Sequence, residues 1–254
     1  MADLDDRLLG ALRDAPDRAA VLVDFDGTLA PIIERADQAR PLPGVAEALA
    51  ALAARYAVVA VISGRPVGYL ARHLPAPASL HGLYGLESAH AGVAARHPSA
   101  APWAAVVDGV ADAAARSGDP ALEVEHKGLS LTLHYRTHPA DAEAVLAWAA
   151  DQAERTGLHL REAKMSVELH PPVSIDKGTV VEDLAAGLDA ACFVGDDVGD
   201  LPAFDALDRL AAGGMTVVRV AVATSESVGE MVTRADAVVA GPEGALALLR
   251  SLVP

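Results

Sequence analysis

Several kinds of residue are scarce in this sequence, and each shortage excludes a class of protein. Cys192 is the one cysteine among 254 residues, so neither an internal disulfide framework nor a cysteine-rich zinc site can form. No apolar run approaches the ~18 residues that a membrane-spanning helix needs, and the residues after Met1 lack the basic and apolar stretches of a signal peptide. Basic residues number 20 against 35 acidic ones, and no basic stripe is present to bind nucleic acid. We therefore expect a cytoplasmic protein that binds neither nucleic acid nor a membrane.

Apolar residues, by contrast, are plentiful. They make up 52% of the chain, which excludes a wholly disordered protein and supplies a sizeable core. The length suits one large α/β domain, or a core that carries a smaller inserted domain.

Strands and helices alternate in the first part of the chain. The leucines between residues 4 and 12 have helical spacing, and a second helix is expected after Pro43. Short apolar runs at residues 21–23 and 58–62 predict buried strands, and both runs end in polar residues and glycine. This order is typical of a doubly wound parallel sheet, which binds its ligands at the carboxyl ends of its strands.

The middle of the chain departs from this alternation. Residues 90–102 are rich in Ala, Pro and Gly and suggest a linker. Two helices are expected after it, near 103–116 and 139–156, together with a strand at 129–135 and further strands around 158–169. Strict apolar–polar alternation favours a half-exposed antiparallel sheet. We predict a separate α+β domain at residues 93–169, inserted between the two parts of the core, 1–92 and 170–254.

The α/β pattern resumes after the Pro171-Pro172 pair. The expected elements are a helix, three strands and a last helix: 178–188, 191–194, 217–223, 237–239 and 244–252. One interrupted core with one insert is the simplest architecture.

Two carboxylates follow the first predicted strand, in the motif DFDGT at residues 24–28. Asp24 and Asp26 would both lie at the ligand edge of the sheet, and like charges so close need a cation or a shared proton. Asp-Gly is also common at an ordinary strand-to-turn junction, so this motif alone leaves a structural role open.

Three further motifs are ambiguous when each is taken alone. Ser63, which precedes Gly64 and Arg65, either caps a helix or aims its hydroxyl at phosphate oxygens. Lys177 by itself is typical of a surface lysine. The sequence GDDVGD at 195–200 follows an apolar strand and is either a solvated acidic loop or a metal site.

Together the motifs indicate a metal and phosphate site at one edge of the sheet. They bring together five carboxylates, those of Asp24, Asp26, Asp196, Asp197 and Asp200. That much negative charge needs a divalent cation, and ligands that are all oxygens favour Mg²⁺ over Zn²⁺. Ser63 and Lys177 would supply a donor and a positive charge for a phosphoryl group.

In order and spacing, these motifs resemble those of the haloacid dehalogenase-like hydrolases. Asp24, Ser63, Lys177 and Asp196 follow one another at intervals of 39, 114 and 19 residues. The long middle interval is where members with a type-2 cap carry that cap. The resemblance implies a Rossmann-like α/β core with an inserted α+β cap domain.

The resemblance also implies a role for each core residue. Asp24 would be the nucleophile that becomes phosphorylated, and Asp26 the acid and base. Mg²⁺ would be held by Asp24, the backbone carbonyl of Asp26 and Asp196. Ser63 and Lys177 would hold phosphoryl oxygens. Asp197 and Asp200 would orient the groups around the metal ion. Gly27, Gly64 and Arg65 would contact the substrate.

A narrower resemblance is to the trehalose-6-phosphate phosphatases. It rests on blocks spread over most of the chain: DFDGTLAP at 24–31, SGRP at 63–66, HGLYGLE at 81–87, EHKGLS at 125–130, HYR at 134–136, KMSVEL at 164–169, DKG at 176–178 and GPEG at 241–244. The chain departs from the family pattern at Gly199, Leu201 and His170, where threonine, glutamate and arginine are usual.

This resemblance implies a Mg²⁺-dependent hydrolysis of trehalose 6-phosphate by a monomer. The sugar would be recognised by six polar residues of the insert: Glu125, Lys127, Ser130, His134, Arg136 and Glu168. Without the resemblance, each could equally be a solvated residue on a strand face. Hinges near 90–102 and 170–172 would let the cap close and exclude water.

Three other functions share much of the pattern. A phosphatase for sucrose phosphate or mannosyl-phosphoglycerate would differ in the cap alone. A phosphomutase would keep both Asp24 and Asp26 but return the phosphoryl group to the sugar. A non-catalytic sensor of sugar phosphates is suggested by the departures at Gly199 and Leu201.

Overall fold

The computed structural model describes residues 6–33, 38–74, 77–119, 122–163, 165–224 and 229–253. The chain divides into two compact units, one of residues 1–95 and 175–254 and the other of residues 96–174. The domain limits expected from the sequence, at 92/93 and 169/170, stay a prediction.

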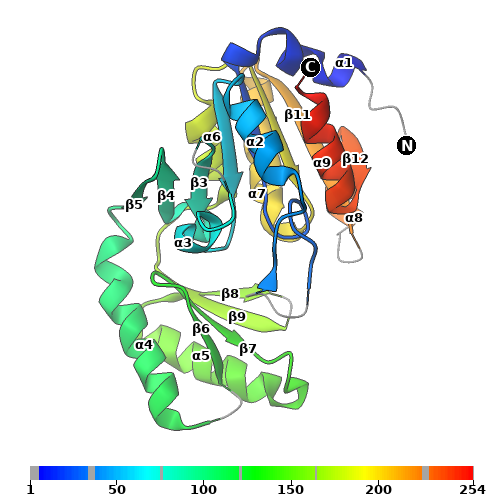
Figure 1. Cartoon of the computed structure of the whole chain (residues 1–254). Helices are drawn as coiled ribbons and strands as arrows, with labels where there is room; N and C mark the ends of the chain where they lie inside the picture. Colours follow the sequence, from blue (N-terminus) through cyan, green and yellow to red (C-terminus); the bar gives the residue numbers. More distant parts are fainter. Residues whose placement is uncertain are drawn as a thin grey trace. The chain divides into compact units, whose positions relative to one another are not determined.

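A sheet of eight strands lies at the centre of the first unit (Figure 1), in the order β12-β11-β10-β1-β2-β3-β4-β5. The pairs from β12 through β3 are parallel, and β4 pairs antiparallel with β3. The strands are β1 (Ala19–Val23), β2 (Val58–Ile62), β3 (Ser79–Gly82), β4 (Glu87–His90), β5 (Val93–Arg96), β10 (Ala190–Gly195), β11 (Thr216–Ala223) and β12 (Ala237–Ala240). The five strands expected from apolar runs in the core are confirmed.

Helices cover both faces of this sheet, because successive side chains of a strand point to opposite sides. Val21 and Val23 of β1 belong to a cluster with α1, α2 and α9, whereas Ala20 and Leu22 belong to a cluster with α6 and α7. The helices of this unit are α1 (Asp6–Asp14), α2 (Val45–Ala53), α3 (Val67–Leu70), α6 (Lys177–Ala185), α7 (Leu201–Ala212), α8 (Gly229–Arg234) and α9 (Gly241–Ser251). The doubly wound core is confirmed.

Several segments differ from the sequence expectation, among them β5 and α7. Residues 93–96, placed within a linker, form β5, because the turn at Ala91-Gly92 has positive φ at both residues and reverses the chain beside β4. Helix α7 was not anticipated, although its buried face of Ala203, Phe204 and Leu207 has helical spacing. Among the described residues, no helix is both long and apolar enough to cross a membrane.

The second unit is an antiparallel sheet packed on two helices (Figure 1). Its strands have the order β6-β7-β9-β8, and every neighbouring pair is antiparallel. Its elements are β6 (Glu123–His126), β7 (Leu131–His134), β8 (His159–Ala163), β9 (Ser166–His170), α4 (Ala104–Ser117) and α5 (Ala142–Thr156). One face of the sheet packs on the helices through Leu131, Leu133, Val167 and Leu169. The inserted α+β unit is therefore confirmed.

Candidate active site

A buried ion-pair network lies at the carboxyl edge of the parallel sheet. Asp24 follows β1 directly, and Lys177 begins α6; their exposed fractions are 4% and 3%. The Lys177 ammonium donates to Asp24 Oδ1 at 2.6 Å and to Asp200 Oδ1 at 2.5 Å. One lysine therefore bridges two carboxylates, one directly after β1 and the other in the loop that follows the neighbouring strand β10.

The second oxygen of Asp200 fixes the acidic loop that follows β10. Asp200 Oδ2 accepts the backbone N–H groups of Asp196 at 2.9 Å and Asp197 at 3.3 Å. Asp197 in turn accepts the N–H of Gly199 at 2.8 Å, which completes a capping box around the turn Val198–Asp200. Asp200 thus orients both the loop and Lys177, while the Asp197 side chain lies at the exposed rim.

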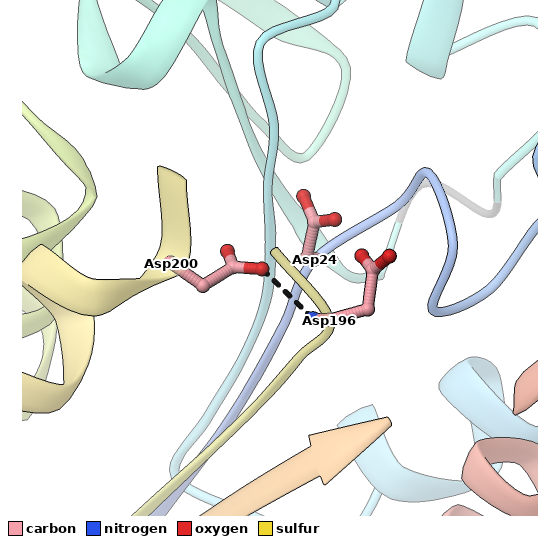
Figure 2. A group of neighbouring side chains, drawn as sticks. All are labelled: Asp24, Asp196 and Asp200. Atoms are coloured by element: carbon pink, nitrogen blue, oxygen red, sulfur yellow. Dashed lines mark hydrogen bonds between the residues drawn. The ribbon is translucent and has the colours of Figure 1, made fainter. Parts of the chain in front are cut away.

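Three carboxylates of this network are close enough to share a cation (Figure 2). One oxygen from each of Asp24, Asp196 and Asp200 lies within 4.8 Å of the others, and all three residues are buried. Gly27 leaves room for Asp196, because a Cβ at Gly27 would lie 2.0 Å from Asp196 Oδ2. Buried oxygen donors of this kind suit Mg²⁺ or Ca²⁺.

Burial and mutual repulsion oppose ionisation of these carboxyls. Burial, reinforced by the charge of Asp200, raises the pKa of Asp196 to about 8. Burial also raises the pKa of Asp24 well above its usual value, against the attraction of Lys177. Burial alone would lower the pKa of Lys177, but Asp200 and Asp24 outweigh it and hold that pKa well above normal. The site therefore keeps a charged lysine and an excess of acids, which a divalent cation would ionise fully.

The motif after β2, the strand next to β1, carries a buried hydroxyl at the same edge of the sheet. Ser63 is 1% exposed, and its Oγ accepts the backbone N–H of Arg65 at 3.1 Å. Within the described ranges, the Ser63 hydroxyl has no hydrogen-bond acceptor of its own. It is therefore available as a donor, as the sequence predicts for a phosphate-binding serine.

Asp26 lies apart from the three clustered carboxylates. Its two oxygens accept from Arg65 Nε at 2.7 Å and Nη2 at 2.6 Å, in a bidentate pair. The Arg65 guanidinium also lies over the ring of Tyr69, 4.5 Å from its centroid. Arg65 is predicted from the sequence to contact the substrate, and in this structure its guanidinium pairs with Asp26.

In the second unit, most of the predicted sugar-binding residues share the polar face of the sheet. Residues paired in register across the four strands form the row Glu125, Thr132, Glu168 and Arg161. Glu168 is buried and accepts from Ser130 Oγ at 2.6 Å and Arg161 at 3.4 Å.

The remaining predicted residues extend this face or stand apart from it. His134 lies 2.9 Å from Glu125, and the Lys127 ammonium is 3.8 Å from both Glu125 and Glu168. Arg136 is exposed and has no hydrogen bond or ion pair with the described residues. The structure thus brings five of the six predicted residues into one network.

Two members of the row were missed at the sequence level. Arg161 and Thr132 carry no family motif. Thr132 lies on β7, whose other face is apolar, whereas β8 has Glu162 on the face opposite to Arg161. The Thr132 hydroxyl is buried and has no hydrogen-bond partner among the described residues. Strand alternation was the signal that could have found Thr132, and no such pattern marks Arg161.

Comparison with known sequences identifies relatives over most of this chain. The sequence model of the trehalose-phosphatase family matches residues 22–239. An uncharacterised glycosyl hydrolase of Mycobacterium tuberculosis is 36% identical over 79% of this chain and 16% of its own length. A trehalose-phosphate phosphatase of Mycobacterium leprae is 33% identical over 86% of this chain and 55% of its own. The chain thus spans about half, or less, of the curated relatives that it matches.

Solved structures with the same fold are also found. The C-terminal domain of a Candida albicans trehalose-6-phosphate phosphatase has a TM-score of 0.75 at 22% identity, covering 98% of this chain and 97% of that one. A haloacid dehalogenase-like hydrolase from Bacteroides thetaiotaomicron has a TM-score of 0.65 at 14% identity, covering 92% and 99%. At these identities the likeness shows the fold, and it confirms the predicted fold class.

Proposed function

Because the chain belongs to the trehalose-phosphatase family, we propose that it hydrolyses trehalose 6-phosphate to trehalose and phosphate through an aspartyl-phosphate on Asp24. The reaction would require Mg²⁺ and would take place in the cytoplasm, in a monomer. The name of the M. leprae relative supports the substrate, and the buried acid–lysine network supports the chemistry.

The geometry of Asp24 is the observation that carries the proposal. Lys177 occupies Asp24 Oδ1, and Asp24 Oδ2 accepts no hydrogen bond from the described residues. One oxygen is thus held by a fixed positive charge while the other is open to attack phosphorus. Asp200 holds Lys177 from the opposite side, so the lysine cannot swing away from the nucleophile without breaking a second buried ion pair.

The donor set supports a magnesium site. The oxygens of Asp24, Asp196 and Asp200 meet within 4.8 Å, and the sequence analysis adds the backbone carbonyl of Asp26. When bound there, Mg²⁺ would neutralise the developing phosphoryl charge. Asp196 is the member with the clearest need for a cation, since its buried carboxyl otherwise holds its proton up to about pH 8, its folded-state pKa.

The chain's own residues account for both chemical steps. In the first, an Asp24 oxygen bonds to phosphorus as the phosphorus–sugar oxygen bond breaks, and Asp26 protonates the departing oxygen. In the second, Asp26 takes a proton from the water that cleaves the aspartyl-phosphate. Ser63 and Lys177 would hold phosphoryl oxygens in both steps. Both Asp26 oxygens accept from Arg65 in this structure, so proton transfer requires Asp26 to give up one of these bonds.

Recognition of the sugar is assigned to the polar face of the second unit. Its network combines acids, bases and a hydroxyl that can exchange their mutual hydrogen bonds for those of sugar hydroxyls. Arg136, which has no hydrogen bond or ion pair with the described residues, would be free to contact the substrate. Another sugar phosphate remains the alternative substrate, because the core residues recognise the phosphoryl group alone.

A phosphate-release screen over a panel of sugar phosphates tests the proposal. We expect trehalose 6-phosphate to have the highest kcat/KM, EDTA to abolish turnover, and Mg²⁺ to restore it. Asp24→Asn should abolish turnover because the nucleophile is lost. The matched control is Asp189→Asn, since Asp189 is exposed, pairs with Arg18 at the amino end of β10 and should tolerate the change.

Other results would point to a different function. Sucrose phosphate or mannosyl-phosphoglycerate in first place would change the substrate but keep the mechanism. A burst of one sugar released per protein, with the phosphoryl group kept on the protein and no turnover, would favour a phosphomutase. Tight binding of sugar phosphates without any hydrolysis would favour a sensor.

A further inference from the structure

The segment that follows β3 has an unusual backbone. Leu83 and Tyr84, two successive residues other than glycine, both have positive φ, at 50° and 59°. L-residues with side chains rarely adopt this left-handed conformation, and such residues gather at functional sites. The segment belongs to the block at residues 81–87, to which neither the sequence analysis nor the proposed mechanism gives a role.

Hydrogen bonds tie this segment to the phosphate-binding motif after β2. The Tyr84 N–H donates to the Ser63 carbonyl at 3.0 Å, and the Leu83 N–H donates to the Arg65 carbonyl at 3.0 Å. The Leu83 side chain is 1% exposed and anchors the segment in the unit's interior. The loop that carries Ser63 thus holds the strained backbone in place. The backbone in turn fixes the direction of the Tyr84 side chain.

The Tyr84 ring lies against the glycine of that loop. A Cβ on Gly64 would lie 2.8 Å from both Cζ and the hydroxyl oxygen of Tyr84. Gly64 does not have positive φ, so its own backbone conformation would accept a side chain. What requires glycine at this position is the close approach of the phenol ring.

The opposite edge of the same ring faces the acidic loop. A Cβ on Gly199 would lie 3.9 Å from Tyr84 Cε1 and 3.1 Å from Asp197 Oδ1. The Ser63–Gly64 loop follows β2 and the Gly199 turn follows β10, on the two sides of β1, which leads to Asp24. Tyr84 therefore lies against the first of the two loops that flank the nucleophile and faces the second.

We propose that Tyr84 is a positioning residue, whose ring sets the distance between the phosphate-binding loop at Ser63–Gly64 and the acidic loop at Asp196–Gly199. This role rests on the proposed phosphatase function of the same site. The ring acts through the backbone of both loops, so its loss should weaken binding of any phosphate monoester, whatever its sugar. A shift of about 1 Å in such groups can cost on the order of a hundredfold in rate.

The test compares Tyr84→Ala with Tyr84→Phe, using inorganic phosphate and p-nitrophenyl phosphate as probes. Tyr84→Ala should weaken phosphate binding and lower kcat/KM for p-nitrophenyl phosphate by roughly tenfold or more, and raise the Mg²⁺ concentration needed for half-maximal activity. Tyr84→Phe keeps the ring and should stay within about twofold of the wild type. Tyr135→Ala, at a half-buried tyrosine that packs in the core of the second unit, is the matched control and should leave phosphate binding unchanged.

A second pair of variants tests the contact itself. Gly64→Ala should impair phosphate binding in the wild-type chain, because its Cβ would meet the phenol. The same change should cost at least threefold less in a Tyr84→Ala background, where the obstacle is gone. Equal costs in the two backgrounds would overturn the proposal.

Two other results would also overturn it: wild-type phosphate binding in Tyr84→Ala, or an equal loss in Tyr84→Phe, which would assign the effect to the hydroxyl. If the wild type hydrolyses p-nitrophenyl phosphate but no sugar phosphate, the proposed function fails. The Tyr84 and Gly64 variants, assayed with p-nitrophenyl phosphate, would still decide the role of Tyr84. A wild type that binds no phosphate overturns both.

Discussion

Replacing Asp196 by asparagine tests the excess of negative charge at the candidate site. The Asp196 side chain is 2% exposed, and its burial together with the charge of Asp200 raises its pKa to about 8. Asparagine has nearly the same shape and no charge. The variant should therefore fold as the wild type does and differ from it in how stability depends on pH and on metal.

The direction of this dependence follows from where the proton is bound. Without metal, the unfolded chain ionises Asp196 near the usual pKa of ~3.9, whereas the folded state holds the proton up to about pH 8, its pKa when buried. The folded state binds more protons between these values, so its stability falls as pH rises. From pH 5 to pH 8, this one group lowers the free energy of unfolding by about 3.6 kcal/mol, or roughly 7–14 °C in unfolding temperature.

Thermal unfolding followed by circular dichroism at pH 5, 6, 7 and 8 measures this effect. In EDTA, the wild type should lose more stability between pH 5 and pH 8 than Asp196→Asn does. The difference should equal the change in unfolding free energy calculated for this one group. Mg²⁺ should stabilise the wild type more at pH 8 than at pH 5, because carboxylate ligands must lose their protons to bind it. Asp189→Asn serves as the control, since Asp189 is exposed and its hydrogen bond with Arg18 lowers its pKa.

Parallel pH profiles for wild type and Asp196→Asn in EDTA would refute this reasoning. They would mean that Asp196 ionises in the folded chain as easily as in water. Equal stabilisation by Mg²⁺ at pH 5 and pH 8 would separately show that the cation binds elsewhere.

Further predictions concern other residues of the two units. Lys177→Met leaves buried carboxylates without their cation and should lower the free energy of unfolding at pH 7 by about 3–5 kcal/mol, as measured by urea denaturation, and abolish phosphate release. Gly27→Ala should lose Mg²⁺-dependent activity, because φ at Gly27 is +74° and the new Cβ would overlap the carboxylate of Asp196; unchanged half-saturation by Mg²⁺ would contradict this. Arg161→Ala removes a cation from buried Glu168 and should raise KM for trehalose 6-phosphate while leaving p-nitrophenyl phosphate turnover unchanged; equal losses with both substrates would argue against a role in sugar recognition.

The core fold could be predicted from the sequence because its signals are local. Strands buried between two layers of helices must be apolar along their whole length, and the runs at 58–62 and 191–194 show this directly. Helix α7 was not predicted because small alanines make up much of its sequence and weaken its apolar pattern. Only its packing against α6 identifies the buried face. The strand at 93–96 escaped notice because every residue in it is exposed and an edge strand needs little apolar character.

The sequence by itself determined which residues are candidates for the chemistry, since carboxylates and a serine after strand ends, with a lysine at a helix start, have few other reasons to recur in this order. Only the tertiary structure decided their partners. Lys177 reaches Asp24 across 153 positions of sequence, and Asp26 turns to Arg65 while Asp200 joins Asp24 and Asp196. Such pairings depend on how neighbouring strands are aligned and on which rotamers the packing permits. The spacing of residues along the chain determines neither of these.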